Sequence, residues 1–289
     1  MRRGKFEAAR KRLPLWYTCL LLLLIALFCG CGWYLADYYM GSRRQAQAFG
    51  DLAATVDNLR PPVRKPTQES PTTAEEDADT PPVQPDTPPL YEDLCNEDGI
   101  LLEYAALHEQ NPDMAGWLSI PGTRINYPVM HTPDRTDYYL KRDFEGTFSN
   151  WGCLYAREEC SITEPSDNVT IYGHNMKDGS MFAGLHAYTS RDFWEEHRYI
   201  CFDTLTAHHT YEIFAVFTTT ASEGMGFAYH DLINAATQEV FDTFVAKCLS
   251  LSLYGTELVP VYGDKIICLS TCEYSQTNGR LVVAAARIQ

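Results

Sequence analysis

Residues 265–272 read Lys-Ile-Ile-Cys-Leu-Ser-Thr-Cys, and residues 280–288 read Arg-Leu-Val-Val-Ala-Ala-Ala-Arg-Ile. Both runs are apolar, and a short polar segment separates them. In a strand, side chains alternate between the two faces, so Cys268 and Cys272 would point the same way. Two such runs joined by a short loop predict an antiparallel pair of strands, with Arg280 close to Cys272.

Six more short β-favouring runs precede this pair, and turn residues separate them. They cover residues 116–120, 125–130, 152–156, 168–173, 199–202 and 210–219. Many short strands of this kind predict an all-β barrel or sandwich. Helical spacing of apolar residues predicts three helices around them, near residues 100–108, 181–188 and 232–249.

The N-terminal part predicts a membrane anchor. Residues 15–35 form an uncharged apolar run, and a helix needs roughly 20 such residues to cross a bilayer. Basic residues dominate the preceding residues 1–14, which is typical of a cytoplasmic N-terminus. We therefore expect a single-pass protein of the cell membrane whose catalytic body is extracellular. The alternatives are a cleaved signal peptide, whose apolar core is usually about 7–15 residues, and a lipoprotein anchored through Cys29 or Cys31.

Residues 36–89 predict a connection rather than a folded domain. Apolar residues at helical spacing between 49 and 59 indicate a short juxtamembrane helix. Residues 61–89 then hold nine of the sixteen prolines, amid Thr, Glu and Asp. Such a segment buries too little apolar surface to fold, so we expect a disordered stalk. The folded domain should span residues 90–289.

Charge and cysteine content exclude several functions. The formal net charge is −15, and the basic residues concentrate at the N-terminus, which argues against nucleic-acid binding. Seven of the ten cysteines lie outside the apolar run, so at least one of these seven is unpaired within the chain. No Cys or His cluster has zinc-ligand spacing, and His208-His209 is an isolated doublet. We expect neither a metal nor a cofactor.

Two residues at predicted strand ends are candidates for chemistry. Cys272 ends its run, where a thiol is held firmly yet is reachable from the loop side. Residues 168–176 read Asn-Val-Thr-Ile-Tyr-Gly-His-Asn-Met, so His174 leaves a second strand in the same way. Taken alone, each has a plainer interpretation: free cysteines are usually buried packing residues, and a lone histidine is usually structural.

Taken together, these motifs resemble those of class B sortases from about Glu103 to the C-terminus. The matching segments are GWLSIPGTRINYPVM (116–130), DYYLKRDFEG (137–146), NVTIYGHNMKDGSMFAGL (168–185), LSTC (269–272) and GRLVVAAARI (279–288). The resemblance implies a mainly β fold: a closed eight-stranded barrel with N-terminal helices and a helix in the insertion before the cysteine strand. Cys268 is a departure, because relatives carry Thr there.

The resemblance also implies the chemistry. It assigns the nucleophile to Cys272, the general acid/base to His174 and the oxyanion-stabilising group to Arg280. We expect Ser270, Thr271 and Asn175 to bind the substrate. The implied reaction cleaves an NPxTx-like C-terminal sorting signal of a Gram-positive surface protein, passes through a thioacyl-enzyme and joins the protein to a cell-wall amine.

Three alternatives remain open from the sequence. A pilin polymerase of the same class would use a lysine amine as acceptor. A non-catalytic surface barrel would leave the cysteine incidental. A secreted cysteine peptidase would need an Asn or Asp acceptor for its histidine, because Arg280 has donors only; no motif supplies that residue.

Overall fold

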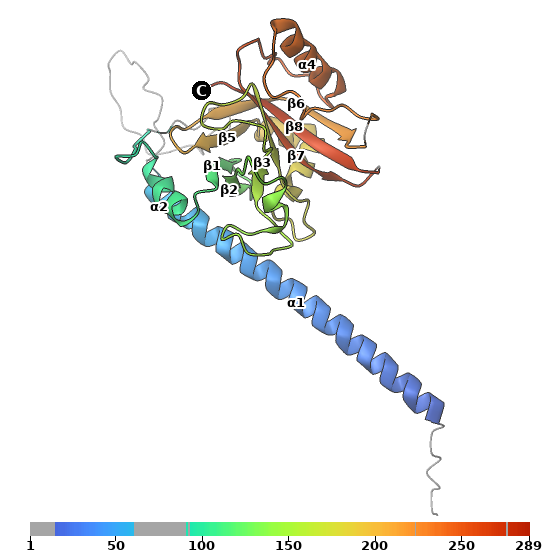
Figure 1. Ribbon diagram of the computed structural model, residues 1–289. Coiled ribbons are helices and arrows are strands. Elements are labelled where there is room, and N and C mark those ends of the chain that lie inside the picture. Colours follow the sequence, from blue (N-terminus) through green and yellow to red (C-terminus); the bar gives the residue numbers. More distant parts are fainter. Residues whose placement is uncertain (1–14, 61–90, 92, 223, 276) are drawn as a thin grey trace, which may run out of the picture. The chain divides into compact units, whose positions relative to one another are not determined.

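The computed structural model describes residues 15–60, 91, 93–222, 224–275 and 277–289 (Figure 1). The chain divides into two compact units, residues 1–45 and 46–289. The expected basic segment 1–14 and the expected stalk 61–89 lie outside the described residues.

The first described element is α1 (Leu15–Leu59), a single helix of 45 residues. The two helices expected from the sequence, residues 15–35 and 49–59, are therefore continuous. Large apolar side chains along the first part are exposed, including Leu22 at 61% and Phe28 at 79%. By length and composition this helix could cross a membrane, and a signal helix would have the same character.

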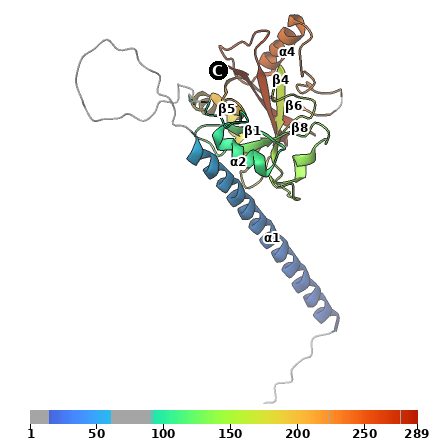
Figure 2. The ribbon, with the colours of Figure 1, turned by 60° about the vertical axis from the view of Figure 1, so that its left-hand side comes forward.

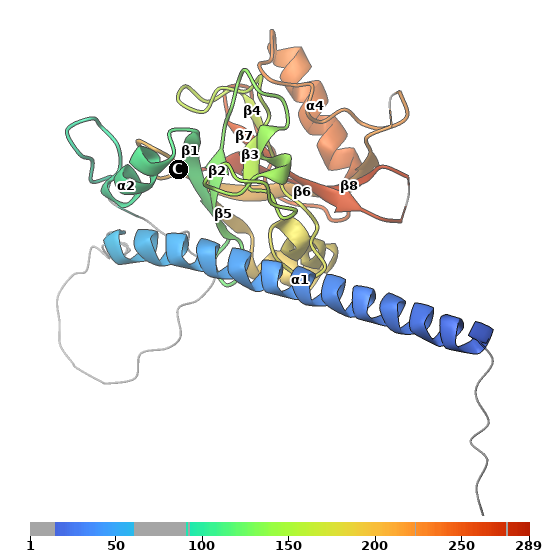
Figure 3. The same ribbon diagram turned by 60° about the horizontal axis from the view of Figure 1, so that its bottom comes forward.

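In the second unit, eight strands of the described chain form a closed barrel, which confirms the expected fold class. Their order around the barrel is β1-β2-β3-β4-β7-β8-β6-β5. Most neighbours are antiparallel, but β2 with β3 and β4 with β7 are parallel. Figure 3 shows β3, β4 and β7 beside one another.

The bounds follow the sequence prediction closely. The strands are β1 (Met114–Ser119), β2 (Asn126–Met130), β3 (Leu154–Ala156), β4 (Asn168–Tyr172), β5 (Tyr199–Thr204), β6 (Thr210–Thr220), β7 (Ile266–Glu273) and β8 (Gly279–Arg287). The helices are α2 (Leu102–Gln110), α3 (Arg191–Glu196) and α4 (Gln238–Leu251), with two 3-10 helices, η1 (Tyr138–Lys141) and η2 (Phe182–Thr189). The helix expected from residue 232 begins only at Gln238, because Thr237 caps it with its side chain.

Helix α4 explains why the last two strands are apolar on both faces. Ile267 and Leu269 of β7 belong to one apolar cluster with the other barrel strands. Cys268, between them, belongs to a second cluster with Phe241 and Phe244 of α4. Figure 2 shows α4 beside β6. Because both faces of β7 and β8 are covered, their sequences are almost continuously apolar.

A buried charged cluster lies at the opposite end of the barrel from Cys272. The side chain of Arg60, just after α1, lies 2.8 Å from Asp203 of β5 and also contacts the hydroxyl of Tyr104. His208, in the turn between β5 and β6, lies 3.1 Å from Asp203 and 3.2 Å from Glu103 of α2. Two cations thus neutralise two carboxylates that water does not reach. We call Arg60, Glu103, Tyr104, Asp203 and His208 the basal cluster.

Candidate active site

Strand pairing brings Cys272 and Arg280 together, and a second ladder ends directly before His174. Cys272 of β7 is directly paired with Arg280 of β8. On the other side of β7, Tyr172 of β4 is paired with Ser270, and the amide of Gly173 continues that ladder to the carbonyl of Ser270 at 3.1 Å. His174 follows directly after this last hydrogen bond of the ladder.

Cys272 differs from the buried thiols of the barrel. Its side chain is partly exposed, whereas Cys268, four residues earlier on the same face, is fully buried. Burial raises the pKa of the Cys268 thiol well above its usual range, which keeps it protonated. Burial likewise raises the pKa of Cys201 and Cys248 to about 12. Since the thiolate is the nucleophile, the geometry favours Cys272 over these neighbours.

The imidazole of His174 has an orienting partner that the sequence did not reveal. Its Nε2 lies 2.7 Å from the backbone carbonyl of Leu140 in η1. A carbonyl only accepts hydrogen bonds, so Nε2 carries the proton and Nδ1 is left with a free lone pair. A main-chain oxygen therefore does what an Asn or Asp side chain does in papain-like enzymes. No sequence motif marks such a group, because any residue supplies a carbonyl.

Arg280 presents an uncommitted charge next to Cys272. Directly opposed residues of an antiparallel pair project from the same face, about 4.5–5.5 Å apart at Cβ. The guanidinium of Arg280 is half-buried and, among the described residues, donates to the backbone carbonyls of Gly279 at 3.0 Å and Asn278 at 3.4 Å. Within the described part of the chain, none of the salt bridges involves Arg280. Its charge is therefore available to an oxyanion.

Ser270 and Thr271 lie beneath the site rather than on its surface. Both side chains are buried, at 1% and 2% exposure. The hydroxyl of Thr271 donates to the carbonyl of Gly173 at 2.8 Å, and that of Ser270 lies 2.6 Å from the hydroxyl of Tyr229. These bonds tie β7 to the chain before His174 and to the segment before α4. Direct contact of Ser270 and Thr271 with substrate stays a prediction; the observed bonds indicate a supporting role.

Tyr229 is a site residue that sequence reasoning missed. It comes from the insertion between β6 and α4, where no strand or helix pattern singles it out. Burial raises its pKa to about 12, although its bond to Ser270 acts in the opposite direction. The positive charge of nearby Arg280 also acts to lower this pKa. The insertion thus forms a wall of the site, with a neutral phenol at its base.

Asn175 is also committed within the protein. Its Nδ2 lies 3.0 Å from the backbone carbonyl of Cys272 and 2.8 Å from Nε2 of His186 in η2. Like the roles of Ser270 and Thr271, its expected substrate contact stays a prediction. The structure adds His186, which the sequence did not mark as different from the other histidines.

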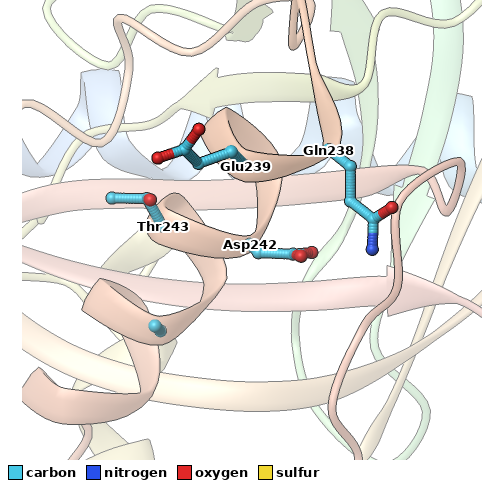
Figure 4. Close-up of a pocket in the computed structure, with 5 residues that line it drawn as sticks. Gln238, Glu239, Asp242 and Thr243 are labelled. Atoms are coloured by element: carbon cyan, nitrogen blue, oxygen red, sulfur yellow. The ribbon is translucent and has the colours of Figure 1, made fainter.

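An open hollow elsewhere on the surface carries no comparable chemistry. It lies against the outer face of α4, where Figure 4 shows the side chains of Gln238, Glu239, Asp242 and Thr243. No thiol or histidine lines it. Among the described residues, no group of three or more His, Cys, Asp or Glu side chains is arranged to hold a metal ion.

Comparison with known proteins identifies the class. The sequence model of the family described as "Sortase domain" matches residues 118–288. The sortase B of Listeria monocytogenes is 36% identical over 183 residues, which cover 63% of this chain and 72% of that protein. The sortase B of Staphylococcus aureus is 29% identical over 189 residues, covering 65% of this chain and 75% of that protein.

Solved structures of sortase B enzymes also match this chain. Sortase B from Bacillus anthracis, in complex with AAEK1, matches with a TM-score of 0.64 and 26% identity, over 87% of this chain and 99% of that one. A Staphylococcus aureus sortase B–substrate complex matches with a TM-score of 0.60 and 28% identity, over 66% of this chain and 86% of that one. These matches define a cysteine transpeptidase. The chain belongs to the sortase family, and the expected resemblance to class B sortases is confirmed.

Proposed function

We propose that this sortase cleaves an NPxTx-like C-terminal sorting signal and joins the released surface protein to a cell-wall amine, with Cys272, His174 and Arg280 as catalytic residues. The observation that carries this proposal is the pairing of Cys272 with Arg280 across β7 and β8, and the end of the adjoining β4 ladder directly before His174 supports it. The particular signal and acceptor are proposed from the resemblance of the sequence motifs to class B sortases.

In the first half of the reaction, the Sγ atom of Cys272 attacks the carbonyl carbon of the Thr–X bond. The thiol proton passes to Nδ1 of His174, the nitrogen that the bond to Leu140 leaves free. Arg280 stabilises the negative oxygen of the tetrahedral intermediate. The C–N bond then breaks, and His174 returns the proton to the leaving amine. The threonine carbonyl remains as a thioester on Cys272.

In the second half, an acceptor amine attacks the thioester carbon and loses a proton to His174. The C–S bond breaks, and Cys272 leaves as a thiolate that recovers this proton. Water can compete at this step, so exclusion of water decides between transfer and hydrolysis. A lysine acceptor, as in pilin polymerisation, would follow the same steps, and only the acceptor site would differ.

The test uses purified full-length protein in detergent with NPxTx-like and LPxTG peptides. Cys272→Ala should abolish cleavage and the thioacyl adduct seen by mass spectrometry, whereas the matched Cys268→Ala variant should keep most activity. A diaminopimelate-like or oligoglycine amine should convert hydrolysed product into amine-linked product. Loss of activity only in Cys268→Ala would remove Cys272 from the mechanism. Hydrolysis with every amine tried would count against transfer to the cell wall.

We further propose that α1 anchors the enzyme with its barrel outside the cell. The exposed apolar side chains of the first part of α1 and the basic residues before it support this orientation. Protease added to intact, wall-stripped cells should then digest the barrel. A barrel protected until the membrane is broken would mean the opposite orientation, and a shortened N-terminus on the mature protein would identify a signal peptide.

A further inference from the structure

The hydrogen-bond ladder between β4 and β7 ends two residues before Cys272, the proposed nucleophile. Up to Ser270, the carbonyls of β7 on that side accept from backbone amides of β4, the last being the amide of Gly173. Carbonyls two residues apart in a strand point the same way, so the carbonyl of Cys272 faces the same side. Continued regularly, the parallel ladder would satisfy it with the backbone amide of residue 175.

A side chain takes the place of that amide. The Nδ2 atom of Asn175 lies 3.0 Å from the carbonyl of Cys272, so its side chain supplies the next hydrogen bond of the ladder while the backbone of residues 173–175 turns away. This departure lets His174 leave the sheet. It also makes the position of the nucleophile's backbone depend on how firmly one amide group is held.

The partner that holds this amide is His186. Its Nε2 lies 2.8 Å from Nδ2 of Asn175 and 3.1 Å from the same carbonyl of Cys272. The alternative amide orientation would place an oxygen against the carbonyl of Cys272, two acceptors facing each other. Nδ2 therefore donates to the carbonyl of Cys272. Both that carbonyl and the amide of Asn175 lie within hydrogen-bond distance of Nε2, so the tautomer of His186 decides which of the two it bonds.

We propose that His186 is a positioning residue: it accepts a hydrogen bond from the side chain of Asn175 and so fixes the amide that holds the backbone of Cys272 at the mouth of the sheet. This inference rests on the proposed function of Cys272 as nucleophile. His186 does not touch the substrate in this scheme. Its effect reaches the reaction through the placement of Cys272 relative to His174 and Arg280.

The test measures kcat and KM for peptide cleavage together with the rate at which iodoacetamide alkylates Cys272, in the full-length protein. His186→Leu should lower kcat roughly tenfold, the effect of losing one well-placed hydrogen bond, with little change in KM. His186→Gln should keep most of the wild-type kcat, because its amide oxygen can accept from Asn175. His108→Gln is the matched control, since His108 bonds the carbonyl of Met114 at the other end of the barrel.

A double-mutant cycle separates positioning from packing. In an Asn175→Ala background, His186→Leu should have no further effect on kcat or alkylation, because the amide that it holds is gone. Additive losses, or a His186→Gln variant as slow as His186→Leu, would overturn the inference. If the wild-type protein forms no thioacyl adduct, the proposed function fails. The alkylation rates then still decide whether His186 places Cys272.

Discussion

His208 of the basal cluster should make the stability of the barrel depend on pH in the alkaline range. Burial alone would lower the pKa of His208, but its bonds to Asp203 and Glu103 outweigh burial and raise the pKa to about 9. An unfolded histidine titrates near pH 6.5. Because the folded state binds the proton more tightly, protonated His208 stabilises the fold fully below pH 6.5. This contribution is lost as pH rises through 9.

The magnitude follows from the two pKa values. A difference of about 2.5 pH units, at 1.36 kcal/mol each, corresponds to about 3 kcal/mol at pH 6 and below. The same linkage gives about 2 kcal/mol at pH 7.5 and less than 1 kcal/mol at pH 9. His208→Gln should therefore lower the free energy of unfolding by these amounts, since Gln offers the carboxylates a neutral donor.

The measurement is urea unfolding of the protein at pH 6, 7.5 and 9, followed by tryptophan fluorescence. His209→Gln is the matched control, one residue away. Burial, followed by the charge of Arg287, lowers the pKa of His209. Its contribution is thus present above pH 6.5 and lost as pH falls, the opposite trend. A His208→Gln effect that stays constant from pH 6 to 9 would refute the charged-histidine account of the basal cluster.

Three further predictions concern the active site. Arg280→Lys should lower kcat on the order of 10²–10³-fold with an unchanged circular dichroism spectrum, since Lys cannot reproduce the planar fork; near-wild-type turnover would exclude Arg280 from the mechanism. Gly152→Ala should lower both Tm and kcat, because Gly152 has φ of +61° and an added Cβ would lie 2.6 Å from the carbonyl oxygen of Leu140 that orients the catalytic imidazole. Gly146→Ala is the control: its φ is also positive, but an added Cβ would lie 3.8 Å from the nearest atom, the hydroxyl of Tyr138. An equal loss of kcat in Gly146→Ala would show that crowding of the Leu140 carbonyl is not the cause. Tyr229→Phe should destabilise the barrel by about 1–3 kcal/mol in thermal or urea unfolding, because it leaves a buried serine hydroxyl unpaired; an unchanged Tm would show that water replaces the phenol.

The fold was predictable because its signals are local. Alternating or continuous apolar runs of strand length, bounded by turn residues, gave all eight strands of the described barrel in the right places. The helix expected at residues 232–249 was predicted to begin too early. Leu232 and Ile233 lie in an irregular segment before α4 and pack against the two apolar clusters from there. A periodic pattern of apolar residues indicates only that one side of a segment is buried. An irregular segment can have such a buried side just as a helix can.

The candidate site was only partly predictable. Cys272, His174 and Arg280 stand at strand ends within recognisable motifs; the pairing of β7 with β8 brings Cys272 and Arg280 together, and the β4 ladder ends directly before His174. Tyr229 and His186 carry no such mark, because folding alone brings Tyr229 to Ser270 and His186 to the carbonyl of Cys272, each more than 40 positions away. The basal cluster was missed for the same reason: His208 looks isolated until β5 and α2 bring two carboxylates to it.

The sequence by itself determined the apolar N-terminal helix, the positions of the strands and the candidate nucleophile, because each of these depends on the order of neighbouring residues. Only the tertiary structure decided which groups orient that chemistry. The carbonyl of Leu140 holds His174, and the amide of Asn175 holds Cys272. Backbone carbonyls and amide groups occur throughout the chain, so nothing but folding selects the one that lies within about 3 Å of a candidate catalytic residue.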